Sequence, residues 1–120
     1  MLNALTIDVE DYFHVSAFES VVPYSDWDRH ESRVENNTHL LLDMMDEGGI
    51  KATFFILGWV AERNPKLVQE IHRRGHEVAS HGYSHKRVYH QSPANFKNET
   101  QKAKKILEDS IGQSVIGYRA

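Results

Sequence analysis

"NPKLVQEIHRRGHEVASHGYSH" (Asn64–His85) contains a helix and a strand from which the fold can be predicted. Asn64 is a common N-cap residue, Pro65 suits the first position of a helix, and Gly75 ends it. The segment "HEVASHG" (76–82) that follows is short and apolar, which predicts a strand. A helix that leads directly into a strand is typical of proteins with parallel sheets.

The same alternation continues on both sides of this stretch. Apolar segments at 2–9, 50–58 and 114–120 predict three further strands, the first of them buried on both faces. Segments 32–49 and 92–113 predict helices, and 10–32 predicts a loop. The first helix has apolar residues at helical spacing: Val34, Leu40, Leu41, Met44 and Met45. The order predicts one α/β domain over 1–120, whose parallel sheet belongs to an open doubly wound fold or to part of a barrel.

The composition excludes several classes of protein. The 120 residues are 40% hydrophobic and 26% charged, as in a globular domain with a core. A net charge of −3 argues against nucleic acid as a partner, and the absence of cysteine excludes disulfides and thiolate metal sites. The chain has neither a leader peptide nor an apolar run that could span a membrane, which predicts a cytoplasmic protein.

Charged and imidazole side chains follow the predicted strands. Asp8, Glu10 and Asp11 come at the end of the first strand, His81 and His85 after the third, and Arg119 in the fourth. Because parallel strands end at the same edge of a sheet, we expect these side chains to lie close together.

Their residue types indicate a catalytic metal site. His81 and His85 are four residues apart, so a turn can bring both rings to one ion, and the crowded carboxylates repel one another without a cation. If the chain stays extended, Glu10 lies on the side of Asp8 and is the favoured oxygen ligand, whereas Asp11 becomes the ligand if the backbone turns after Val9. Two histidines and a carboxylate leave positions open for water and substrate, and suit zinc. Asp8 is then the candidate general base, paired with Arg119. The other histidines are predicted to be at the surface or structural: His14, His30, His39, His72, His76 and His90.

Three motifs, "TIDVED" (6–11), "SHGYSH" (80–85) and "GYRA" (117–120), resemble in this order the polysaccharide deacetylases of the NodB-homology group, carbohydrate esterase family 4. "DVEDYF" (8–13) resembles the subgroup associated with bacterial exopolysaccharide and exosortase loci. The resemblance implies an irregular seven-stranded (β/α) barrel, a divalent metal, usually zinc, and removal of N-acetyl groups from an amino-sugar polysaccharide. It also implies that Asp8 is the base, that His81 and His85 bind the metal, and that Arg119 orients the base. The family has a second aspartate where this sequence has Val9, so the carboxylate ligand is Glu10 or Asp11.

A barrel of this type has about 250 residues, so the resemblance implies that the chain is the amino-terminal half of the domain. The histidine that serves as general acid is expected beyond Ala120, which predicts weak or no activity for this chain alone. The cut sheet edge predicts self-association. Two other functions fit the residues: hydrolysis of small cyclic amides or ureides on the same barrel, and metal or glycan binding without catalysis.

Overall fold

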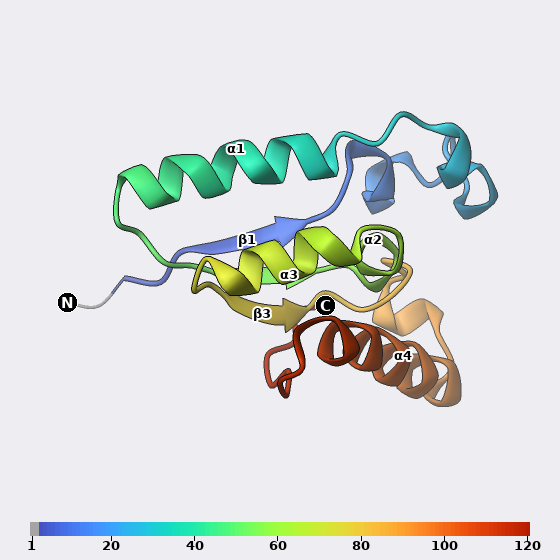
Figure 1. Ribbon diagram of the computed structural model, residues 1–120. Helices are drawn as coiled ribbons and strands as arrows, with labels where there is room; N and C mark the ends of the chain where they lie inside the picture. The colour runs from blue at the N-terminus through green and yellow to red at the C-terminus, as the bar shows by residue number, and fades with distance from the viewer. Residues whose placement is uncertain (1–2) are drawn as a thin grey trace.

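The computed structural model describes residues 3–120, and a three-stranded parallel sheet forms its centre. The strands β1 (Thr6–Val9), β2 (Thr53–Ile56) and β3 (Glu77–Ser80) are hydrogen-bonded in the order β1-β2-β3. In Figure 1 the arrows of β1 and β3 point the same way. The predicted α/β class with a parallel sheet is therefore confirmed. Leu2, predicted to open the first strand, lies outside the described residues.

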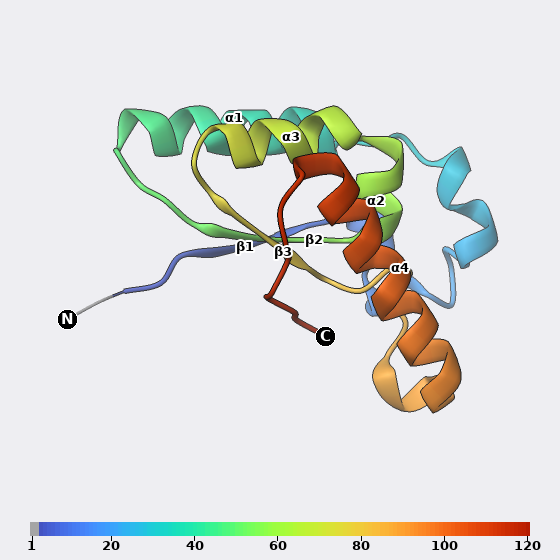
Figure 2. The ribbon, with the colours of Figure 1, turned by 60° about the horizontal axis from the view of Figure 1, so that its bottom comes forward.

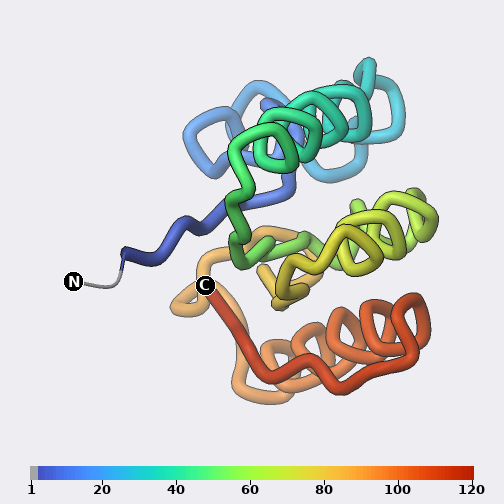
Figure 3. The backbone as a smooth tube through the Cα atoms, turned by 60° about the vertical axis from the view of Figure 1, so that its left-hand side comes forward, coloured from blue at the N-terminus to red at the C-terminus, as the bar shows by residue number. Residues whose placement is uncertain are grey.

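Three helices form a layer against one face of this sheet (Figure 2, Figure 3). They are α1 (Val34–Glu47), α3 (Pro65–Arg73) and α4 (Pro93–Ile111). The core lies between the helices and the strands, and it includes these fully buried side chains: Leu42, Phe54, Ile56, Leu67, Ile71 and Leu107. Because all three helices lie on one side, the opposite face of the sheet is free to present functional groups.

That free face corrects the prediction for the first strand, which is buried on one face only. Val9 is 1% exposed, but Thr6 and Asp8, which point the other way, are exposed. The apolar sequence predicts cover on both faces, but the helices cover only one (Figure 3). Asp8 thus lies at the sheet surface, beside Phe55 of β2 in the strand register.

The chain after α4 forms less of a strand than its apolar sequence predicts. Over 114–120 the structure has one isolated parallel bridge, between Ser80 and Tyr118. Ser80 N donates to Gly117 O at 2.9 Å, and Arg119 N donates to Ser80 O at 2.9 Å. A Cβ at Gly117 would lie 2.8 Å from the Cβ of Ala79, so glycine permits this close approach. The segment follows the path of a fourth parallel strand without a continuous ladder.

The predicted helices are present, but their faces and caps differ in part. α1 buries Val34, Thr38, Leu42 and Met45. Leu40 and Met44 are exposed, so the prediction that they belong to the apolar face was wrong. The true face follows steps of three and four residues from Val34, which include a threonine. At α4, Ser92 Oγ accepts from Asn95 N at 3.2 Å, as its sequence predicts.

The segment between β2 and α3 contains a helix that the sequence did not predict. α2 (Gly58–Arg63) begins directly after β2, where Gly58 was expected only to end the strand. Asn64 does not cap α3 with its side chain. Its Nδ2 donates to Val60 O in α2 at 3.0 Å. The loop before α1 contains three short 3₁₀ helices: η1 (Tyr12–His14), η2 (Ser16–Phe18) and η3 (Tyr24–Arg29). A fourth, η4 (Val88–His90), precedes α4.

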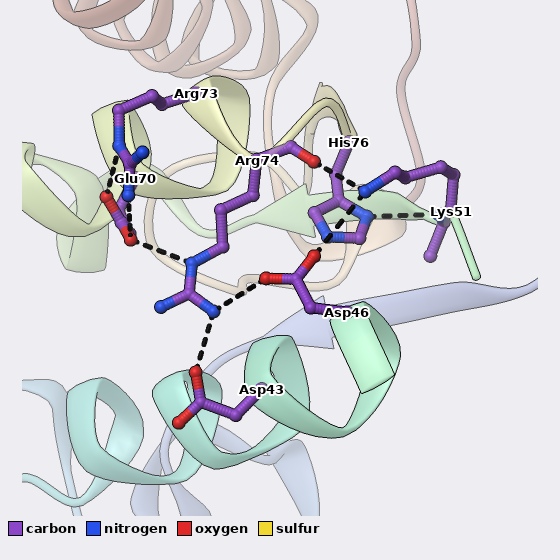
Figure 4. Close-up of polar contacts among 8 residues, drawn as sticks. Asp43, Asp46, Lys51, Glu70, Arg73, Arg74 and His76 are labelled. Atoms are coloured by element: carbon purple, nitrogen blue, oxygen red, sulfur yellow. Dashed lines mark hydrogen bonds and ion pairs between the residues drawn. The ribbon is translucent and has the colours of Figure 1, made fainter. Parts of the chain in front are cut away.

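A charge network ties α1 to α3 at the amino-terminal end of the strands (Figure 4). The Arg74 guanidinium lies 2.7 Å from Glu70, 2.7 Å from Asp43 and 2.9 Å from Asp46. Lys51 Nζ donates to Arg74 O at 2.8 Å. These ion pairs join neighbouring helices at the edge where (β/α) folds place stabilising contacts, and ligand sites belong to the opposite edge.

No helix within 3–120 is long and apolar enough to cross a bilayer.

Candidate metal centre and catalytic site

Three potential metal ligands meet at the carboxyl ends of the strands. Glu10 Oε2 lies 3.5 Å from His81 Nε2 and 3.0 Å from His85 Nε2. The three ligand atoms lie within 4.8 Å of one another. Glu10 follows β1 directly and His81 follows β3, so two strands separated by β2 deliver the group.

The turn that carries the histidines is held by neighbouring backbone. His81 N donates to Ile56 O at 3.0 Å, and its Nδ1 lies 3.1 Å from Arg119 O. The amides at the start of α2 donate to the next two carbonyls of the turn, from Gly58 to Gly82 at 2.7 Å and from Trp59 to Tyr83 at 3.1 Å. The unpredicted helix α2 therefore supports the turn.

The electrostatics of the group are those of a cation site. Burial opposes ionisation of Glu10, but the neighbouring His81 and His85 imidazoles outweigh it and lower the pKa of Glu10 to about 2. Burial also disfavours a charged His81, yet the Glu10 carboxylate and the Arg119 carbonyl raise its pKa. Both ring nitrogens of His81 face oxygen acceptors, Nδ1 the Arg119 carbonyl and Nε2 the Glu10 carboxylate, so this ring needs a second proton or a bound cation at Nε2. The donor set of two nitrogens and one oxygen fits such an ion.

A second pair of charges lies beside this group on the free face of the sheet. Arg119 Nη1 lies 2.6 Å from Asp8 Oδ1, and Nη2 donates to Thr6 Oγ1 at 2.7 Å. The guanidinium also stacks 4.1 Å from the centre of the Phe55 ring. Asp8 and Glu10 are two residues apart at the end of an extended strand, so both carboxylates reach the same side. Arg119 thus fixes Asp8 with its side chain and His81 with its carbonyl.

Comparison with known proteins identifies the family. The sequence pattern described as polysaccharide deacetylase matches residues 21–120. The chain belongs to this family. A peptidoglycan-N-acetylglucosamine deacetylase of Bacillus cereus is 35% identical to this chain over 75 residues, which are 62% of this chain and 27% of that enzyme.

Solved structures of polysaccharide deacetylases share the fold. A peptidoglycan N-acetylglucosamine deacetylase superposes with a TM-score of 0.68 at 27% identity, over 92% of this chain and 42% of that one. A pseudoenzyme of the same family from Bacillus anthracis superposes with a TM-score of 0.73 at 21% identity, over 96% of this chain and 33% of that one. The chain therefore spans less than half of each of these relatives, and the fold alone does not distinguish an active deacetylase from an inactive one.

Asp11, the alternative carboxylate ligand, has another role in this chain. Its Oδ2 accepts from Ser32 Oγ at 2.7 Å and from Val34 N at 3.3 Å, and its Oδ1 accepts from Arg33 N at 3.0 Å. Arg33 occupies the N-cap position of α1 and supplies no capping side chain, so Asp11 caps the helix from a distant part of the chain. The structure brings Glu10, and not Asp11, to His81 and His85.

His14 is a buried residue whose contact with the acidic turn the sequence did not reveal. It is 2% exposed, and its Nδ1 accepts from Asp11 N at 2.7 Å. The rings of Trp27 and Trp59 lie 4.4 Å and 4.9 Å from its own ring, centre to centre. Burial is the largest cause of its shift and lowers the pKa of His14 to about 4. A neutral imidazole therefore fixes the turn that follows Glu10.

A cavity of about 390 Å³ adjoins the metal-ligand group. His81 and His85 form part of its wall; Val88, Phe96 and Tyr118 contribute apolar surface, and Lys86, Arg87 and Glu99 contribute charged groups. A concave, mostly apolar space beside a few converging polar groups is the usual form of a small-molecule site. The described residues thus provide both a ligand group for a cation and room for a substrate next to it.

Proposed function

We propose that this deacetylase removes N-acetyl groups from an amino-sugar polysaccharide, with a divalent cation, zinc, bound by Glu10, His81 and His85. One observation carries the proposal: these three ligands meet within 4.8 Å of one another beside an aspartate that an arginine holds in place. The name of the Bacillus cereus relative, a peptidoglycan-N-acetylglucosamine deacetylase, supports an N-acetylated glycan as the substrate. The "DVEDYF" motif further supports an exopolysaccharide.

The residues divide the chemistry of amide hydrolysis among them. A bound divalent cation supplies Lewis acidity, which activates water and polarises a carbonyl. Asp8 accepts the proton of the water that adds to the acetamide carbon, as a general base. Arg119 holds the Asp8 carboxylate in one rotamer, and His81 is oriented by the Arg119 carbonyl. The C–N bond then breaks, and acetate and the free amine of the sugar are the products.

Release of the amine requires a general acid. We propose that this acid is a histidine outside the 120 residues, since the chain spans 27% of the Bacillus cereus enzyme. Loss of a general acid typically slows a reaction about 10²- to 10⁴-fold. We therefore expect the 120-residue chain alone to bind metal and to release acetate slowly or not at all.

The test is an assay of acetate release from N-acetylglucosamine oligomers by the protein in its longest natural form. We expect acetate when zinc is added and none after treatment with a chelator. Allantoin serves as the comparison substrate, because its ring opening would indicate the alternative activity on cyclic amides. Ring opening of allantoin without acetate release would contradict the proposal. Stoichiometric zinc binding without turnover would contradict it as well, and would support a non-catalytic role like that of the pseudoenzyme.

A further inference from the structure

The two histidines of the metal-ligand group are held in different ways. His81 has a partner for its second ring nitrogen, the carbonyl of Arg119 at 3.1 Å. His85 has none: its Nδ1 is buried and makes no hydrogen bond to any residue in 3–120. Metal-binding histidines are usually oriented by a hydrogen bond from the second nitrogen. The orientation of the His85 ring therefore depends on its backbone and on its packing against the His81 ring, 5.1 Å away from centre to centre.

That backbone is in an uncommon conformation. His85 has a φ of 55°, in the left-handed region, and is the one residue other than glycine with positive φ among those described. Such a conformation persists only where neighbouring contacts impose it, and it is typical of functional sites. The contacts from α2 end at Tyr83, two residues before His85. Another contact has to hold the end of the turn.

Ser84 provides that contact. It is 4% exposed, and its hydroxyl lies 2.7 Å from each carboxylate oxygen of Glu99. Glu99 lies in the second turn of the 19-residue helix α4, so the acceptor belongs to a regular element and not to a loop. A hydrogen bond to a charged carboxylate is stronger than one between neutral groups. Among the described residues it is also the one side-chain hydrogen bond that joins α4 to a residue next to His85.

We propose that Glu99 is a positioning residue, which acts through Ser84 to hold His85 toward Glu10 and His81. The inference rests on the proposed role of His85 as a metal ligand. Without Glu99, the buried Ser84 hydroxyl has no acceptor, and the backbone at His85 can relax from the left-handed region. The ring then turns away from Glu10 Oε2, which lies 3.0 Å from it in the present structure. The metal-ligand group would have to reassemble each time that an ion binds.

Binding of Co²⁺ tests the proposal, because its absorption spectrum reports the ligand geometry as well as the affinity. The variants are Ser84→Ala, Glu99→Ala, the double variant, and Glu99→Gln, whose amide oxygen can still accept from Ser84. We expect Ser84→Ala and Glu99→Ala each to weaken Co²⁺ binding about tenfold, the lower end of the effect of residues that orient metal ligands. The double variant should bind no more weakly than Glu99→Ala, because the two residues act as one unit. Glu99→Gln should bind within about threefold of the wild type and keep its spectrum.

The matched control is Ser92→Ala, which removes another serine hydrogen bond at the start of the same helix. We expect it to lower the melting temperature and to leave the Co²⁺ spectrum and affinity unchanged. If Glu99→Ala and the double variant bind Co²⁺ as the wild type does, or if Ser92→Ala weakens binding equally, Glu99 is only structural and the proposal is wrong. A wild type that binds no Co²⁺ overturns the metal-site proposal and this one together.

Discussion

Replacement of Asp8 by asparagine is expected to reduce acetate release about 10²- to 10⁴-fold, the usual effect of removing a general base. The amide has nearly the shape of the carboxylate, and its oxygen can still accept from Arg119, which lies 2.6 Å from Asp8 Oδ1. It cannot take up a proton from water. Because Asp8 lies outside the metal-ligand group, zinc binding should be unchanged. Acetate release and zinc content are to be measured on the same preparation.

The control for this substitution is Asp109→Asn, which changes an exposed carboxylate paired with Lys105 on α4. Its acetate release should match that of the wild type. An Asp8→Asn enzyme that keeps more than about a tenth of the activity would show that another group accepts the proton. Loss of zinc from Asp8→Asn would instead indicate that Asp8 is a metal ligand.

Replacement of His81 by alanine is expected to weaken zinc binding by more than about 10²-fold. Replacement of a residue that only orients a metal ligand weakens metal binding by up to about 10²-fold. Because His81 is proposed as a ligand itself, its loss should have a larger effect. The change removes one of three donors and also frees the carbonyl of Arg119, which lies 3.1 Å from His81 Nδ1. Acetate release should fall to the background level. Equilibrium titration with zinc against a competing chelator measures the change.

His90 offers a matched control from the same part of the chain. It is exposed, it is the last residue of η4, and it lies outside the metal-ligand group. We expect His90→Ala to bind zinc as the wild type does. Equal zinc binding by the His81→Ala and His90→Ala variants would contradict the assignment of the site.

The sequence predicted the architecture because its signals are local. A capping residue at one end of a helix and a glycine at the other, as at Ser92 and Gly112, depend on a few neighbouring residues. Alternation of helix and strand then implies a parallel sheet, and the parallel sheet implies one edge for the polar side chains. The two-residue period of an extended strand also indicated which carboxylate reaches the histidines, and the structure brings Glu10 rather than Asp11 to them.

The remaining features depend on contacts between distant parts of the chain. Asp11 caps a helix that begins 23 residues later, a role that no local pattern around Asp11 contains. Glu99, the hydrogen-bond partner of Ser84, is 15 residues away on α4. The sequence around Ser84 shows neither this contact nor the left-handed backbone of His85. The short helix α2 was not predicted. Its first amides bond to the histidine turn, and the sequence between β2 and α3 does not show this contact with a distant part of the chain.

The most direct test of the central claim is anomalous X-ray scattering at the zinc edge from crystals of the zinc-loaded protein. If Glu10, His81 and His85 hold one ion, a single strong peak will lie within coordination distance, about 2.0–2.2 Å, of the Glu10 carboxylate and both Nε2 atoms. A map with no peak among these three side chains, or with the strong peak at other histidines, would contradict it.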